Sequence, residues 1–192
     1  NAASFVPLSA HLHAQTLDLV LLDLPGHGHS AWLPIGADYS LSTTIEHMLQ
    51  IADALGWERF TLLGHSLGGG VASLLAAAAP QRVEALIAIE ALGALAEPVE
   101  STAKRLRDAV ASARTLPERP LRVFPSMEMA VRARMMVNQL TEPTARLLVE
   151  RGVRVVDGGY SWCSDPRLTL PAAIRMTEAQ IEAYVVTGEP MG

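Results

Sequence analysis

The 192-residue sequence has one cysteine, one lysine and few aromatic residues, which make up 5% of the chain. A single cysteine, Cys163, excludes an internal disulfide and a cysteine-only metal cage, so a reducing compartment is expected. The scarcity of lysine, together with a net charge of −5, leaves no broad cationic surface for nucleic acid or anionic lipid. We expect neither of these partners.

Long apolar runs and early basic residues are also missing. The longest apolar stretches lie near residues 74–79 and 85–96, shorter than the roughly 18 residues that a membrane span needs. The first basic residue is Arg59, so no secretory signal with a positively charged start is visible. The sequence therefore predicts a soluble protein of the cytoplasm.

What is present is apolar material for a packed core, since 49% of the residues are hydrophobic. Residues 1–96 carry a net charge of −6, whereas residues 97–167 carry +3 and change to an Arg-rich, helical pattern. This shift predicts a core segment over residues 1–95 and a mainly helical segment over residues 96–192.

Apolar periodicity predicts alternating strands and helices in the core segment. An almost continuous apolar run suits a strand of a parallel sheet that is buried on both faces, and apolar residues at 3,4 spacing suit a helix. The expected strands are Thr16–Leu24, Phe60–Leu63 and Val83–Ile89, and the expected helices are Leu41–Leu55, capped by Ser40 or Ser42, and Val71–Ala79. This order predicts an α/β fold with a parallel sheet.

The second segment contains four stretches with helical periodicity. Two of them begin with Thr followed by Glu, which is typical of a capped helix start. The expected helices are Thr102–Ala113, Met127–Val137, Thr141–Arg151 and Thr177–Val186.

The motif that carries chemistry is G-x-S-x-G at residues 64–68, between a predicted strand and a predicted helix. A serine raised on a sharp strand-to-helix turn has a strained backbone, and glycines at Gly64 and Gly68 are expected to clear space around it. The helix N-terminus would direct free N–H groups at the Ser66 hydroxyl, with the amide of Leu67 as a donor to a developing oxyanion. The competing interpretation is a glycine-rich turn with an incidental serine.

The sequence DLPGHGHS at residues 23–30, a capped helix, and then TLLGHSLGGG at residues 61–70 resemble the α/β-hydrolase superfamily. Further on, VDGGYSW at residues 156–162 and DPRL at residues 165–168 resemble the cap of its serine hydrolase-like branch. The resemblance implies a partial parallel-sheet hydrolase core, a helical cap over a pocket, Ser66 as nucleophile and Leu67 as backbone oxyanion donor. It also implies acyl transfer to water from an ester or thioester, as in a carboxylic ester hydrolase, with a small-molecule substrate and no cofactor.

All six histidines lie at or before the serine motif, and none follows Ser66. A serine needs a base, and in this superfamily the histidine comes after the nucleophile and the acid. We therefore expect a fragment that lacks both ends of the core and is inactive alone. The alternative is a non-catalytic binding protein that keeps the pocket without the base.

Glu90 is the candidate acid, because it ends a predicted strand at the edge where catalytic groups of parallel sheets gather. The alternatives are an acid after a later strand and a purely structural Glu90. His65 is expected at the edge of a pocket or in packing, since adjacent side chains on such a turn diverge. Asp23 is expected to cap the following Pro-Gly turn.

Other sites are disfavoured. The sequence has neither a dinucleotide fingerprint nor a phosphate loop with its lysine. The histidine pairs at residues 11 and 13 and at residues 27 and 29 have no third ligand nearby, so turn or surface positions are favoured over a metal site.

Overall fold

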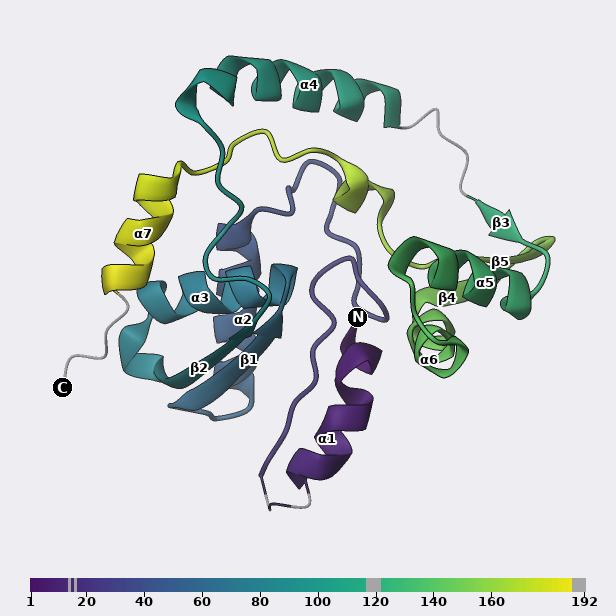
Figure 1. The fold of residues 1–192 in the computed structure, drawn as a ribbon, viewed down its shortest axis with the longest axis horizontal. Coiled ribbons are helices and arrows are strands. Elements are labelled where there is room, and N and C mark those ends of the chain that lie inside the picture. Colours follow the sequence, from purple (N-terminus) through teal and green to yellow (C-terminus); the bar gives the residue numbers. More distant parts are fainter. Residues whose placement is uncertain (14, 16, 117–121, 188–192) are drawn as a thin grey trace. The chain divides into compact units, whose positions relative to one another are not determined.

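The computed structural model describes residues 1–13, 15, 17–116 and 122–187 (Figure 1). The chain forms two compact units, one made of Asn1–Ala37 and Thr115–Thr169, the other of Asp38–Arg114 and Leu170–Gly192. Both units take residues from the predicted core segment, 1–95, and from the predicted cap segment, 96–192. The role of residues 96–192 as a cap stays a prediction.

A parallel strand pair organises the second unit. Strand β1 (Phe60–His65) and strand β2 (Val83–Ile89) pair along their length, with His65 opposite Ile89 at the carboxyl end. Helix α3 (Leu67–Ala78) and the short 3₁₀ helix η2 (Pro80–Arg82) connect them. The predicted β-α-β order and the α/β class with a parallel sheet are confirmed here, although helix α3 begins four residues before the predicted Val71.

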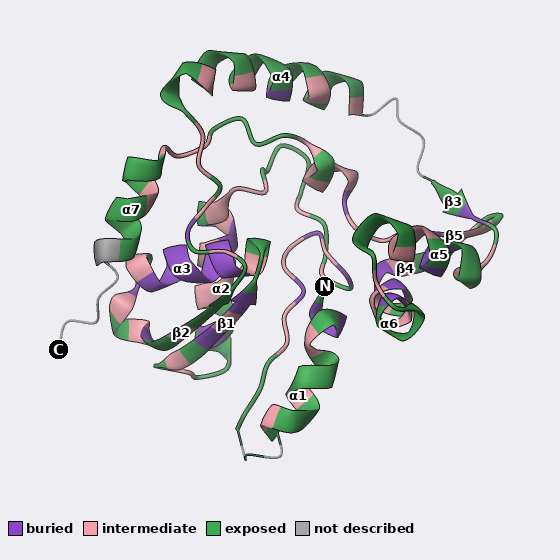
Figure 2. Cartoon of the chain, in the orientation of Figure 1, coloured by how far each residue is buried: buried purple, intermediate pink, exposed green. Residues whose placement is uncertain are grey.

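Helix α3 forms the core of this unit, and Figure 2 shows most of it buried. Its side chains pack with Leu62 of β1 and Val83 of β2 in one apolar cluster. Helix α2 (Leu41–Ala54) contributes the partly buried Ile45, Met48 and Leu49 to the same cluster. The start of α3 lies close to β1, since a Cβ atom on Gly64 would lie 2.3 Å from the carbonyl oxygen of Gly68.

Helix ends in this unit are capped by local side chains. The hydroxyl of Ser40 accepts a hydrogen bond from the amide of Thr43 at 3.1 Å, which settles the predicted choice between Ser40 and Ser42. The amide of Thr177 donates to the side chain of Gln180 at 2.9 Å, and the amide of Gln180 donates to the Thr177 hydroxyl at 3.4 Å, a reciprocal capping box. The remaining elements are η3 (Val99–Ser101), α4 (Thr102–Thr115) and α7 (Glu178–Thr187).

The first unit contains a small antiparallel sheet with strand order β3-β5-β4. Its core joins Phe124 and Trp162, whose rings meet edge to face at 5.3 Å, to the facing sides of two helices. The elements are η1 (Ala2–Phe5), α1 (Val6–His13), β3 (Val123–Phe124), α5 (Met127–Asn138), α6 (Glu142–Gly152), β4 (Val153–Val156), β5 (Gly159–Trp162) and η5 (Pro166–Thr169).

The predicted strand Thr16–Leu24 is wrong. Residues 17–24 have no strand pairing in the described part of the chain, and Leu17, Leu19 and Val20 are exposed rather than buried on both faces. Thr16 lies outside the described residues. The apolar pattern indicates that these residues favour a strand, but a strand also requires a neighbouring strand, and none of the described strands pairs with residues 17–24.

Candidate active site

Ser66 lies at the junction of β1 and α3, between the last strand residue, His65, and the first helical residue, Leu67. Its backbone has φ 52° and ψ −119°, a region that non-glycine residues rarely adopt. Ser66 is exposed, and its side chain makes no capping hydrogen bond to the helix. The junction therefore presents the hydroxyl at the carboxyl edge of the strand pair, as the sequence predicts for a nucleophile elbow.

Backbone hydrogen bonds hold Ser66 in this conformation. Its amide donates to the carbonyl oxygen of Ile89 on β2 at 2.9 Å, and its carbonyl accepts from the amide of Gly70 at 3.0 Å. Ser66 is thus tied to the neighbouring strand on one side and to the first turn of α3 on the other. Strain at a residue fixed by its surroundings is typical of functional sites.

The glycines of the motif have different roles. A Cβ atom on Gly64 would lie 2.3 Å from the carbonyl oxygen of Gly68, so this position requires glycine. A Cβ atom on Gly69 would lie 2.9 Å from the carbonyl oxygen of Ala91, so the helix packs closely against the loop after β2. The expected requirement at Gly68 is wrong, because nothing lies within 4 Å of a Cβ atom built there.

The first turn of α3 supplies N–H groups next to Ser66. The first amides of a helix have no partner within the helix, and the helix dipole places partial positive charge there. The amide of Ser66 itself is already used by Ile89. Leu67, the predicted oxyanion donor, is the first residue of α3 and directly follows Ser66, and its role as a donor stays a prediction.

Glu90 and His65 form a hydrogen-bonded pair. The Oε2 atom of Glu90 lies 2.9 Å from Nε2 of His65, and the side chains are 75% and 47% exposed. Glu90 also has a left-handed backbone, with φ 57°. His65 is therefore an exposed partner of a carboxylate and not a packing residue. The sequence places Glu90 at this edge, but only the strand register, with His65 opposite Ile89, brings the two side chains together.

Asp23 belongs to the other unit and does more than cap a turn. Its carboxylate, with a side chain only 2% exposed, accepts hydrogen bonds from the amides of Ala2 and His29 and from the guanidinium of Arg151. Burial alone raises the pKa of Asp23, but these hydrogen bonds and the charge of Arg151 outweigh it and hold the pKa below its usual value. Sequence reasoning missed Arg151, which lies 128 positions away and carries no local signal.

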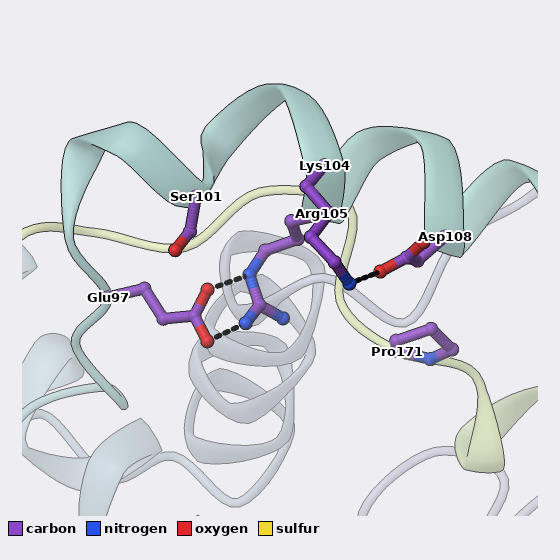
Figure 3. Close-up of a pocket in the computed structure, with 6 residues that line it drawn as sticks. All are labelled: Glu97, Ser101, Lys104, Arg105, Asp108 and Pro171. Atoms are coloured by element: carbon purple, nitrogen blue, oxygen red, sulfur yellow. Dashed lines mark hydrogen bonds and ion pairs between the residues drawn. The ribbon is translucent and has the colours of Figure 1, made fainter.

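A small cavity of about 150 Å³ lies beside α4 in the second unit (Figure 3). Its charged residues are paired: Glu97 binds Arg105, and Lys104 binds Asp108 at 2.6 Å. Ser101 and Pro171 complete its lining, so Ser66 is not part of it.

Among the residues that the structure describes, no three His, Cys, Asp or Glu side chains come together in a way that could hold a metal ion. No helix in the same part of the chain combines the length and the apolar character needed to cross a bilayer.

Comparison with known proteins identifies relatives over most of the chain. A family model described as alpha/beta hydrolase fold matches residues 1–142. A serine hydrolase-like protein of Danio rerio is 33% identical over 157 residues, covering 79% of this chain and 48% of that protein. A probable serine hydrolase of Drosophila melanogaster is 33% identical over 194 residues, covering 96% of this chain and 57% of that protein. The chain thus spans about half the length of these relatives.

Solved structures show the same fold. A hypothetical protein of Pseudomonas aeruginosa superposes with a TM-score of 0.91 at 40% identity, covering 98% of this chain and 67% of that one. The thioesterase domain from the curacin biosynthetic pathway superposes with a TM-score of 0.81 at 23% identity, also covering 98% of this chain and 67% of that one, which shows a shared fold alone. From the family match, the relatives and the strand–Ser66–helix junction, we conclude that the chain belongs to the α/β-hydrolase family, in its serine hydrolase-like branch.

Proposed function

We propose that this chain supplies the nucleophile of a serine hydrolase that cleaves an ester or thioester through an acyl-enzyme. The backbone of Ser66, with φ 52° and ψ −119° between β1 and α3, is the observation that carries the proposal. A serine that only filled a turn would need neither this strained conformation nor the close packing at Gly64. Two proteins of similar structure, a thioesterase domain and a Mycobacterium tuberculosis esterase, support this reaction class.

In the proposed reaction the Ser66 oxygen attacks the substrate carbonyl while a histidine takes the hydroxyl proton. The carbonyl oxygen becomes an oxyanion and accepts a hydrogen bond from the amide of Leu67. Collapse of this intermediate breaks the ester or thioester bond, and the imidazolium returns the proton to the leaving alcohol or thiol. Water, deprotonated by the same histidine, then cleaves the acyl-enzyme and restores Ser66.

The histidine of this scheme is not among the residues after Ser66, because no histidine follows that position in the sequence. We therefore propose that the base is supplied from outside these 192 residues and that the chain alone lacks full turnover. The same feature favours a second candidate function, a binding protein with the hydrolase fold and no triad. Both candidates predict a serine elbow, so only reactivity separates them.

The test uses a fluorophosphonate probe, which labels only activated serines, on an extended protein that carries the chain with its flanking coding sequence on both sides. We expect labelling that disappears in Ser66→Ala. Ser42→Ala is the matched control, since Ser42 is an exposed serine in the first turn of α2, and it should label normally. A folded extended protein that takes up no label at Ser66 would support the binding protein instead.

A further inference from the structure

We propose that Glu90 and His65 form a strand-end clamp, a side-chain bridge that positions Ser66, with Glu90 acting through His65 and not as the carboxylate of the catalytic triad. The proposal rests on the proposed hydrolase function of Ser66. Glu90 is a positioning residue in this sense, because its contact is with His65.

The clamp lies next to the bond that fixes the nucleophile. His65 and Ile89 are opposite each other in the parallel pair, and the next residue of each strand is Ser66 and Glu90. The Ser66 amide donates to the Ile89 carbonyl at 2.9 Å, and the His65–Glu90 hydrogen bond of 2.9 Å joins the same two strand ends. One backbone bond and one side-chain bond therefore bridge the strands at the nucleophile.

Backbone conformation marks the same place. In the described part of the chain, three non-glycine residues have positive φ, namely Ser66, Glu90 and Gln139. Gln139 follows the end of α5 in the left-handed conformation common after helices. The other two lie at neighbouring strand ends, and after Glu90 the chain turns so that the carbonyl of Ala91 lies against α3 at Gly69. The surrounding structure must hold Ser66 and Glu90 in these two unfavourable backbone conformations, and the clamp supplies part of that restraint.

The surroundings of Glu90 do not suit a triad carboxylate. A triad carboxylate is buried and binds the imidazole that faces the nucleophile. Glu90 is 75% exposed, and its Oε2 atom already binds Nε2 of His65. His65 directly precedes Ser66 in the chain, so this bond holds the elbow from its N-terminal side.

The size of the expected effect separates the two roles. An exposed side-chain hydrogen bond contributes little, so Glu90→Ala should lower kcat about two- to fivefold with KM unchanged. Glu90→Gln should restore most of this loss, because an amide oxygen still accepts the His65 N–H. A triad carboxylate would behave differently: both variants would lose activity by about 10⁴-fold, because a neutral amide cannot stabilise the imidazolium.

The experiment is a double-mutant cycle in the extended protein with p-nitrophenyl acetate. In a His65→Ala background, Glu90→Ala should have no further effect, since its partner is gone. Glu84→Ala is the matched control, because it removes an exposed carboxylate from the other end of β2, and it should leave kcat unchanged. Additive losses at positions 65 and 90, or a 10⁴-fold loss in Glu90→Gln, would overturn the clamp.

A second measurement keeps the clamp testable if the hydrolase proposal fails. Hydrogen exchange of the Ser66 amide reports the opening of its bond to Ile89 and needs no activity. Glu90→Ala should speed this exchange about two- to fivefold, and only when His65 is present. Unchanged exchange would reject the clamp, whereas coupled exchange in a protein without Ser66 labelling would keep the clamp and reject the hydrolase function.

Discussion

The amide of Ser66 donates a hydrogen bond to the carbonyl oxygen of Ile89 at 2.9 Å. The bond joins the end of β1 to the end of β2 and uses the N–H group of Ser66 itself. In the proposed reaction, an oxyanion at Ser66 therefore needs other hydrogen-bond donors, and the amide of Leu67, the next residue, is the donor that we propose. The strand pair thus decides which donors remain available to the site.

The first prediction concerns activity of the 192-residue chain. Removing one member of a nucleophile–base unit costs about as much as removing all of it, on the order of 10⁶ in kcat in a serine protease series. If the base lies outside these 192 residues, as we propose, the chain should hydrolyse p-nitrophenyl acetate no faster than its Ser66→Ala variant, while the extended protein should show serine-dependent turnover. Brisk turnover by the short chain that Ser66→Ala abolishes would place the base among the histidines at or before His65.

The second prediction separates two glycines of one motif. A Cβ atom on Gly64 would lie 2.3 Å from the Gly68 carbonyl oxygen, so Gly64→Ala should lower the free energy of unfolding by about 1–3 kcal/mol. Gly68→Ala is the matched control. Gly68 belongs to helix α3, and a Cβ atom added there would have no other atom within 4 Å. It should be neutral or stabilise by up to about 1 kcal/mol. Urea unfolding followed by circular dichroism measures both, and equal losses would contradict the assigned packing.

Sequence periodicity predicted the helices and strands that depend on residues within their own segment, or whose pairing partner is near in the sequence. Helix α2 and strands β1 and β2 lie within a residue or two of their predicted bounds, because their apolar spacing and capping residues are encoded in short segments. Residues 17–24 have the same apolar character but no strand partner among the described residues, and a pattern within one segment cannot show whether a partner exists.

In the candidate site, too, the local features were predicted and the contacts between distant residues were not. The motif predicted the place of Ser66, because the strand–turn–helix context is local. The bond between Glu90 and His65 and the bond between Asp23 and Arg151 depend on register and tertiary packing, so spacing in the sequence gave no sign of either.

The third prediction concerns association of the 192-residue chain. Strand β2 pairs with β1, its one ladder partner among the described residues, and leaves Ile87 and Ile89 48% and 39% exposed. An apolar strand with an unpaired edge is a template for pairing between chains, so the chain should aggregate, and Ile87→Lys should slow aggregation. Ile174→Lys is the matched control, since Ile174 is 82% exposed outside any strand. Light scattering measures the aggregation rate of each variant. If both variants slowed aggregation equally, the effect would come from the added charge and not from the strand.

The fourth prediction is a pH dependence of stability that depends on Asp23. Its pKa is held below the unfolded value of about 3.9 by the amides of Ala2 and His29 and by Arg151, against the opposing effect of burial. A carboxylate with a depressed folded-state pKa adds stability that is fully present above the unfolded pKa and is lost as the pH falls through the folded pKa. Asp23→Asn should therefore lower the free energy of unfolding by about 1.5–3 kcal/mol at pH 7, and this loss should become steadily smaller below pH 4.

Urea unfolding of the chain and of its Asp23→Asn variant between pH 7 and pH 2.5 measures how the difference between their free energies of unfolding changes with pH. Asp18→Asn is the matched control, because Asp18 is an exposed carboxylate five positions earlier on the same segment. Its cost at pH 7 should be small, because an exposed carboxylate can exchange its protein contacts for water. A cost for Asp23→Asn that stayed constant down to pH 2.5 would mean that the carboxylate charge contributes nothing, and that the buried hydrogen bonds alone hold the loop of residues 23–30 in place.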